Sequence, residues 1–423
     1  MKIDFQTETL ANGLRVFYLP KQETNAVTVM FAFKVGSRYE TAKQNGLSHF
    51  LEHMFFKGTE KRPNSQAISQ VLDTLGAEFN AFTSEEVTAY YVSTDKANFN
   101  IAFDVLTDML YHSKFEAEEI AKEKGVISEE IKMYADNPMS HIYEISKLLA
   151  YGDTPLGRDI AGTHASVNAF ERQDFIDYLE KFYTPANTVV IIAGNGQVQD
   201  WQQAVAPLSE LPAGATSQFE AQTKLTDELL RHSPKPIDQV HLDLIVPGLK
   251  RTDAAMPTLT ILSNILGGTM SSRLFVEVRE KAGLAYYVRS QIEDTHDIGI
   301  LSLAAGVDPQ KLPQAVLTIG KELDKLMSDP VAAEELSRAK QNIRGKMSLR
   351  LESSYALANY IASEAIAHDQ IEQPDQWLAK LEAVTASEVQ ALAKKLLARG
   401  QRKLAMVGPV EPATLERLQQ SLN

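Results

Sequence analysis

Cysteine is absent from the 423 residues of this chain. Disulfide bonds and thiolate metal sites are therefore excluded, which leaves histidine, aspartate and glutamate as the strong metal ligands. Lysine and arginine never cluster beyond adjacent pairs and the formal net charge is −13, so binding to nucleic acid or to an anionic membrane surface is disfavoured. The chain also lacks an apolar run of about 18 residues, and its first residues contain no apolar signal core. We therefore expect a cytoplasmic protein without a membrane segment.

The composition is that of a folded protein with more than one domain. Apolar residues make up 44% and charged residues 23% of the chain, as in soluble globular proteins. A chain of this length usually divides into two or three domains. Between about 208 and 236 the periodic patterns give way to proline, glycine, alanine, serine and threonine. We therefore predict a first domain at 1–210, a linker at 211–236 and a second domain at 237–423.

The order of predicted elements in the first half returns in the second half. In each half a buried strand is followed by an apolar helix, then by a strand pair, two long helices and a closing strand. The buried strands are expected at 26–33 and 240–246, and the closing strands at 188–193 and 403–407. This repetition predicts an α+β fold of two homologous domains, each a mostly antiparallel sheet covered by helices.

The stretch His-Phe-Leu-Glu-His at 49–53 lies inside the apolar run 47–56. On a helix, His49 and His53 lie one turn apart on one face, and Glu52 is next to His53. The pattern H-x-x-E-H is the inverted form of the zinc-peptidase motif H-E-x-x-H, in which two imidazoles bind zinc and the glutamate acts as a general base. The alternative is that two histidines only share a buried helical face.

A catalytic zinc site needs a third protein ligand and an open position. The candidates lie on the helix predicted at 116–134, which is rich in glutamate. They are Glu116, Glu118, Glu119, Glu123, Glu129 and Glu130. Composition alone does not choose among them, because most glutamates on such a helix form a solvated face.

Three sequence features follow one another along the chain: the H-x-x-E-H motif, the segment Asn-Ala-Phe-Thr at 80–83, and the pattern S-R-L-F-x-x-x-R-E-K-x-G-L-A-Y at 272–286. Together they resemble the pitrilysin, insulysin and mitochondrial processing peptidase family, and the likeness spans nearly the whole chain. The resemblance implies a zinc metalloendopeptidase that holds one Zn²⁺ per chain and hydrolyses short or unfolded peptides. His49 and His53 would bind the metal, and Glu52 would be the general base.

The resemblance also selects the third ligand. In the family this ligand is a glutamate that follows, seven residues on, another glutamate that supports the site, and Glu130 and Glu123 match that spacing. Residues seven apart share one helix face, whereas Glu129 is rotated by about 100° from Glu130. The second half has Ala339 and Lys346 at the matching positions. Glu123 would orient a histidine through its ring N–H, and a surface salt bridge is its alternative role.

Two further groups of residues match positions that contact the substrate in the family. Asn80, Ala81, Phe82 and Thr83 resemble an edge strand that binds a peptide by β-augmentation, and an ordinary paired strand is the alternative. In β-augmentation the peptide is held by main-chain hydrogen bonds, which tolerate many peptide sequences.

Arg279 and Tyr286 match the family's pair that reaches the substrate or the tetrahedral intermediate, and both offer hydrogen-bond donors for a carbonyl oxygen. Alternatively, Arg279 pairs with Glu277 or Glu280 and Tyr286 only packs. Tyr287 would replace Tyr286 if the strand register differed by one residue.

Family members commonly enclose four such domains in a chamber, made from one long chain or from two shorter chains. A chain with two domains is therefore expected to form a homodimer, and a heterodimer with a related subunit is the alternative. Arg279 and Tyr286 would then serve the zinc site of their own chain or of the partner chain. Two other readings remain: a peptide-binding or assembly subunit without turnover, and the active subunit of a heterodimeric processing peptidase.

Overall fold

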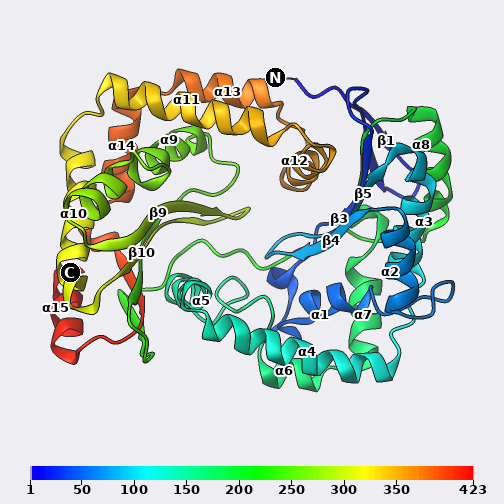
Figure 1. Ribbon diagram of the computed structural model, residues 1–423, viewed down its shortest axis with the longest axis horizontal. Coiled ribbons are helices and arrows are strands. Elements are labelled where there is room, and N and C mark those ends of the chain that lie inside the picture. The colour runs from blue at the N-terminus through cyan, green and yellow to red at the C-terminus, as the bar shows by residue number, and fades with distance from the viewer. Residues whose placement is uncertain (1, 369, 423) are drawn as a thin grey trace. The chain divides into compact units, whose positions relative to one another are not determined.

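The computed structural model describes residues 2–368 and 370–422 and divides the chain into two compact units (Figure 1). Unit 1 comprises Met1–Lys132, Asp159–Glu220 and Ser348–Pro374. Unit 2 comprises Met133–Arg158, Ala221–Met347 and Asp375–Asn423. Each unit contains one mostly antiparallel sheet and many helices, so the predicted α+β fold class is confirmed. None of the described helices has the length and apolar character needed to cross a membrane.

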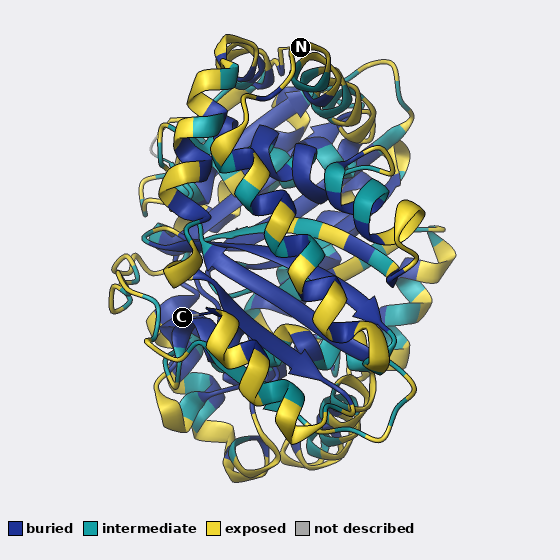
Figure 2. Ribbon diagram, turned by 90° about the vertical axis from the view of Figure 1, so that its left-hand side faces the viewer, coloured by how far each residue is buried: buried dark blue, intermediate teal, exposed yellow. Residues whose placement is uncertain are grey.

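Unit 1 contains a six-stranded sheet in the order β1-β2-β6-β3-β5-β4. Its strands are β1 (Gln6–Thr9), β2 (Arg15–Pro20), β3 (Ala26–Phe33), β4 (Glu78–Thr83), β5 (Thr88–Asp95) and β6 (Thr188–Gly194). Neighbouring strands pair antiparallel, except for β2 and β6, which are parallel. The central strands β3 and β6 are almost completely buried. Figure 2 shows the general pattern, in which strands are largely buried and helices expose one face. β4 stands at the end of the sheet and pairs with β5 on one side.

Helices cover this sheet and complete its core. They are α1 (Leu47–Met54), α2 (Ser65–Thr74), α3 (Phe99–Tyr111), α4 (Ala117–Asp136), α6 (His164–Ala169), α7 (Arg172–Phe182), α8 (Val198–Val205) and α12 (Ser354–Ala367). Aromatic side chains from α1, α7 and the sheet pack together, with Phe50 on Phe175 at 4.9 Å and Phe55 on Tyr90 at 5.1 Å between ring centroids. The motif helix α1 is thus fixed to the sheet by its apolar face.

Unit 2 repeats this plan with five strands in the order β7-β11-β8-β10-β9. They are β7 (Leu230–Ser233), β8 (Val240–Pro247), β9 (Ala285–Asp294), β10 (Gly299–Val307) and β11 (Lys403–Val407). β7 and β11 are parallel, as β2 and β6 are in unit 1, and the other pairs are antiparallel. The strand order of unit 1 from β2 onward therefore recurs in unit 2.

The helices of unit 2 follow the same succession. They are α5 (Pro138–Tyr151), α9 (Met256–Gly267), the π-helix η6 (Phe275–Lys281), α10 (Leu312–Ser328), α11 (Ala333–Arg350), α13 (Pro374–Ala383), α14 (Ala386–Leu396) and α15 (Pro412–Leu422). α11 begins with two glutamates in its first turn, as α4 does. The two long helices that carry Glu130 and Lys346 are thus equivalent elements of the repeat.

Each sheet is covered by one helix from the other half of the sequence. α5 packs on β8 and β11 of unit 2, and α12 packs on β3 and β6 of unit 1 (Figure 1). In unit 1 the Ser354 hydroxyl lies 2.9 Å from the Thr28 hydroxyl. The division predicted from the sequence into 1–210 and 237–423 assigns α5 to the first domain and α12 to the second. In the structure, α5 packs in unit 2 and α12 packs in unit 1.

The residues between the two halves are more ordered than the composition of 211–236 suggests. β7 lies within that range and pairs with β11. In unit 1, Ser217 N–H donates to Asn187 Oδ1 at 2.7 Å, and the Phe219 ring lies under the Arg38 guanidinium at 3.8 Å. In unit 2, Thr226 N–H donates to Ala150 O at 2.9 Å. The connecting segment is therefore held by specific contacts at each end.

Candidate metal centre

The H-x-x-E-H motif lies on α1, which begins after Gly46. Gly46 has a φ of 97°, and a Cβ there would lie 2.7 Å from Ala161 O, so glycine is required where the chain enters the helix. Phe50 and Leu51 are fully buried in the core. The apolar face of α1 is therefore packed in the core. Its other face carries His49, His53 and Glu52, which lie toward α4 and β4.

Glu40 anchors the beginning of α1, a role that the sequence alone does not indicate. Its Oε2 accepts from Gly46 N–H at 2.8 Å, and its Oε1 accepts from Ser48 N–H at 2.7 Å. The Ser48 hydroxyl in turn lies 2.7 Å from Tyr178 OH. These bonds satisfy N–H groups at the helix terminus that have no partner within the helix. Burial raises the pKa of Glu40 from 4.5 to about 7, against the opposing effect of the bonds from Ser48 and Gly46.

We expect Glu40 to make stability depend on pH. Because the folded protein holds this proton up to about pH 7, while the unfolded chain releases it near its ordinary pKa, stability falls as pH rises between these values. Relative to Glu40→Gln, the wild type should lose up to about 3 kcal/mol of unfolding free energy across that window. Denaturant unfolding of both proteins from pH 4.5 to 7.5 measures the difference. Parallel curves would contradict the shift.

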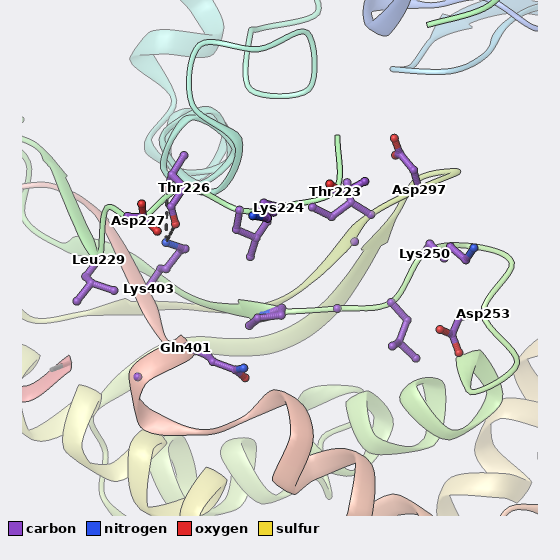
Figure 3. Close-up of a pocket in the computed structure, with 17 residues that line it drawn as sticks. Thr223, Lys224, Thr226, Asp227, Leu229, Lys250, Asp253, Asp297, Gln401 and Lys403 are labelled. Carbon is purple, nitrogen blue, oxygen red and sulfur yellow. Dashed lines mark hydrogen bonds between the residues drawn. The ribbon is translucent and has the colours of Figure 1, made fainter. Parts of the chain in front are cut away.

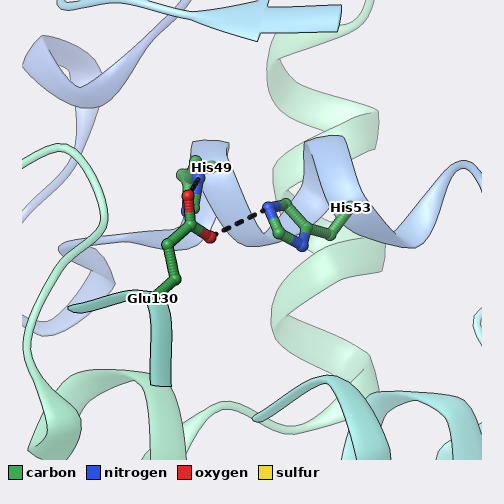
Figure 4. A group of neighbouring side chains, drawn as sticks. All are labelled: His49, His53 and Glu130. Atoms are coloured by element: carbon green, nitrogen blue, oxygen red, sulfur yellow. Dashed lines mark ion pairs between the residues drawn. The ribbon is translucent and has the colours of Figure 1, made fainter. Parts of the chain in front are cut away.

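Three side chains from α1 and α4 converge on one point (Figure 4). The His49 Nε2 lies 3.7 Å from Glu130 Oε1, and the His53 Nε2 lies 3.5 Å from Glu130 Oε2. One ligand atom from each of the three residues lies within 4.8 Å of the others. Among residues 2–368 and 370–422, this is the one such group of three histidine or acidic side chains.

The spacing of these atoms fits a metal ion better than direct hydrogen bonds. The separations of 3.5 and 3.7 Å exceed hydrogen-bond distances. They approach the roughly 3.3 Å that separates two ligand atoms around tetrahedral zinc. Burial, with a smaller effect of His53, lowers the pKa of His49 to about 3, so that its imidazole is neutral, as a metal ligand must be. Two imidazoles and one carboxylate form a donor set that suits zinc.

Glu123 supports His53 from the side away from Glu130. Its Oε1 lies 2.8 Å from His53 Nδ1, and its Oε2 accepts from Lys57 Nζ at 2.6 Å. Burial favours the neutral form of Glu123, but the bonds from His53 and Lys57 outweigh it and lower its pKa. An ionised Glu123 accepts from Nδ1–H, which leaves Nε2 of His53 free to face Glu130.

Lys57 was not identified from the sequence, because it follows the end of α1 in a turn where helical periodicity no longer places side chains. We expect Lys57→Met to weaken zinc binding by about tenfold, since the outer partners of metal ligands typically contribute 10–100-fold in affinity. Chelator competition with the metal-free protein measures this effect. Lys132→Met is the matched control, because Lys132 forms an exposed pair with Glu129 at 2.6 Å. Equal affinities of the two variants would contradict the role of Lys57.

Glu52 lies on the same helix and is held by the edge strand. Thr83 Oγ1 donates to Glu52 Oε2 at 2.5 Å. Burial raises the pKa of Glu52, and the hydrogen bond from Thr83 opposes this rise. The segment Asn80 to Thr83 forms the larger part of β4, at the end of the unit 1 sheet.

Arg279 and Tyr286 belong to unit 2. The group of His49, His53 and Glu130, called the metal group below, belongs to unit 1. Arg279 is exposed on the π-helix η6, with its guanidinium 4.7 Å from the Phe275 ring centroid. Glu277 pairs with Lys281 at 2.7 Å. This arrangement differs from the alternative in which Glu277 is the partner of Arg279.

The two tyrosines at the start of β9 have different surroundings. Tyr286 is 62% exposed. Tyr287 OH lies 3.0 Å from His241 Nδ1, and its ring occupies the space next to Gly306, where a Cβ would come within 2.5 Å of it. In this register the Tyr287 side chain packs against β8 and β10 of unit 2, whereas the Tyr286 side chain is exposed to solvent.

A separate cavity of about 620 Å³ lies in unit 2, between residues 223–229 and the ends of β8 and β10 (Figure 3). Two of its charged side chains, Lys403 and Asp253, bond to the backbone of the surrounding loops. Lys403 Nζ donates to the carbonyl oxygens of Thr226 at 2.5 Å and Glu228 at 2.6 Å. Asp253 Oδ1 accepts from Ala255 N–H at 2.8 Å. Lys403 and Asp253 therefore stabilise the fold of unit 2.

The fold and the site define a class: proteins of two repeated α+β units in which the first unit carries a His–His–Glu group. Comparison with known families agrees with this class. Residues 15–164 match the insulinase family model (peptidase family M16), and residues 169–343 match the peptidase M16 inactive domain. The chain belongs to the insulinase family, M16.

Similar proteins extend over the whole chain. An uncharacterized zinc protease of Bacillus subtilis is 34% identical over 407 residues, which cover 95% of this chain and 97% of that protein. An uncharacterized zinc protease of Streptomyces coelicolor is 34% identical over 427 residues, with coverage of 97% and 91%.

Solved structures share the fold. A protease from Helicobacter pylori has a TM-score of 0.90 at 22% identity, covering 97% of this chain and 100% of that chain. A Pseudomonas fluorescens structure described as a peptidase M16 inactive domain has a TM-score of 0.89 at 19% identity, with coverage of 97% and 99%.

Proposed function

We propose that this protein is a zinc metalloendopeptidase that hydrolyses short or unfolded peptides. His49, His53 and Glu130 would hold one zinc ion per chain. The observation that carries the proposal is the convergence of these ligand atoms from α1 and α4 within 4.8 Å of one another, next to the half-buried carboxylate of Glu52 on α1. Membership of the M16 family and the zinc proteases among its relatives support it.

Each side chain has a distinct task in this reaction. Bound zinc supplies a Lewis acid and a water of lowered pKa at this position. Glu52 accepts the proton of the attacking water and passes it to the leaving amine. Its raised pKa brings this base closer to the working pH, which favours proton transfer in both directions. Glu123 fixes the ring of His53, and Lys57 keeps Glu123 ionised and in place.

Substrate alignment would use the edge strand of unit 1. A peptide that adds to β4 forms main-chain hydrogen bonds, which accept many sequences but require an extended chain. Arg279 and Tyr286 would donate hydrogen bonds to a substrate carbonyl or to the tetrahedral intermediate. Their solvent-exposed positions in unit 2 are compatible with such a role.

The proposal is tested by combining metal analysis with cleavage of a library of unstructured peptides. We expect one zinc per chain, cleavage of unstructured peptides, loss of cleavage after chelation and recovery when zinc is returned. A folded protein offered as substrate should remain intact. Stoichiometric zinc without cleavage of any peptide would favour the alternative of a peptide-binding subunit.

We also propose that two copies of the chain form the working enzyme. The support is the resemblance to family members that assemble four domains, of which this chain supplies two. We expect a dimer in sedimentation analysis at micromolar concentration. Mixing Glu52→Gln with Arg279→Ala chains should restore activity if Arg279 serves the partner's site. A monomer that is fully active in cleavage would contradict the dimer.

A further inference from the structure

Thr83, the last residue of β4, makes contacts in two directions. Its hydroxyl donates to Glu52 Oε2 at 2.5 Å, which links the edge strand to the general base on α1. The sequence suggested only a contact between this residue and the peptide. The side chains of Ala81 and Phe79, two and four positions earlier, lie on the same face of the strand as Thr83, because successive side chains alternate between faces.

The main chain of Thr83 belongs to the outer edge of the sheet. In an antiparallel pair, alternate residues direct their N–H and C=O groups to the partner strand, and the residues between them direct these groups away. Ala81 N–H donates to the side chain of its neighbour Asn80 at 2.9 Å, which assigns Ala81 to the outward set. Thr83 lies two residues further along and shares this orientation. Ser84 N–H donates to Val87 O, which is consistent with the alternation.

We propose that Thr83 is a positioning residue that fixes the carboxylate of Glu52 and links its orientation to a peptide bound along β4. This inference rests on the proposed peptidase function. The last torsion of a glutamate side chain is broad, so an unrestrained carboxylate samples many orientations. The hydroxyl of Thr83 engages Oε2 and leaves Oε1 for the proton of the attacking water. A peptide that bonds to the main chain of Thr83 would hold the strand, and with it this hydroxyl, in place.

A purely structural role makes different predictions. If the hydroxyl only tied β4 to α1, its removal would lower stability without a specific effect on turnover. Thr88 provides the comparison, because it pairs with Thr83 in the register and its hydroxyl donates to Val35 O at 3.0 Å instead of Glu52. Thr88→Val therefore removes a strand hydroxyl from the same sheet without touching the base.

The experiment compares Thr83→Val, Thr83→Ser and Thr88→Val. Valine keeps the shape and the strand preference of threonine but has no hydroxyl. We expect Thr83→Val to lower kcat by about tenfold, a fraction of the full effect of a general base, with KM within about twofold of the wild type. Thr83→Ser should restore kcat. Thr88→Val should lower stability while kcat stays at the wild-type level.

Two further measurements separate this inference from the proposed function. Peptide affinity and zinc affinity of the metal-free protein should be unchanged by Thr83→Val. In a Glu52→Gln background, Thr83→Val should produce no additional loss, because Thr83 acts through Glu52. An unchanged kcat in Thr83→Val, an equal loss in Thr83→Ser, or a further loss in the Glu52→Gln background would overturn the inference. Failure of the proposed function would instead appear in the wild type, as an absence of peptide cleavage.

Discussion

Glu52→Gln is expected to lower kcat for peptide hydrolysis by about 10²–10⁴-fold, the usual contribution of a general base. Glutamine has nearly the same shape and can still accept the hydrogen bond that Thr83 donates to Oε2. It cannot take up the proton of the attacking water. Zinc content and peptide affinity should therefore remain at wild-type levels while turnover is lost. Single-turnover cleavage of a quenched fluorescent peptide, together with metal analysis of the same sample, measures both quantities.

Glu60→Gln is a suitable control for this variant, because Glu60 is exposed just beyond α1. It changes the net charge by the same amount and should leave kcat unaffected. If Glu52→Gln retained the wild-type rate, Glu52 would not be the base. If Glu52→Gln lost zinc, the substitution would have disturbed the metal ligands. Its loss of activity would then not identify Glu52 as the general base.

The residues that converge on the metal group could be predicted because their spacing is a property of regular helices. His49 and His53 lie one turn apart on α1, and Glu123 and Glu130 lie two turns apart on α4. The apolar residues between them determine which face is buried. Spacing therefore fixes which side chains share a face. Choosing Glu130 over its neighbours also needed the family resemblance, because six glutamates lie on or beside that helix.

Contacts that depend on tertiary packing could not be predicted in this way. Glu40 lies in a loop and reaches the start of α1 through two backbone N–H groups. Lys57 lies in a turn, and Thr83 reaches Glu52 from a different element. No periodicity connects these positions in the sequence. Their partners are determined by the packing of α1 against the sheet.

α5 and β7 are two of the elements that the sequence patterns did not reveal, each for a local reason. α4 ends at Asp136, and α5 begins two residues later at Pro138, where the missing N–H costs nothing, with Asn137 Oδ1 accepting from Met139 N–H at 3.0 Å. β7 has only four residues, too few to show a strand period. The repeat made β7 predictable in principle, since β2 holds the equivalent position beside β6.

Glu130→Gln is expected to weaken zinc binding by more than about a hundredfold, because loss of a direct ligand should exceed the 10–100-fold effect of outer partners. A neutral amide is a weaker ligand than a carboxylate and leaves the ion with less compensating charge. Titration of the metal-free protein with zinc in the presence of a competing chelator measures the affinity directly, independently of turnover. Circular dichroism of the same samples verifies that α4 and its neighbours stay folded.

Glu129→Gln provides the decisive comparison for Glu130→Gln. The two glutamates are adjacent on α4, so both substitutions remove one negative charge from the same part of the same helix. They differ in direction: Glu129 pairs with Lys132 at 2.6 Å in solvent, whereas Glu130 faces His49 and His53. A general effect of charge would weaken zinc binding similarly in both variants, which would contradict the assignment of Glu130. A loss confined to Glu130→Gln can arise only from the geometry of the side chain, because composition, position in the helix and charge are matched.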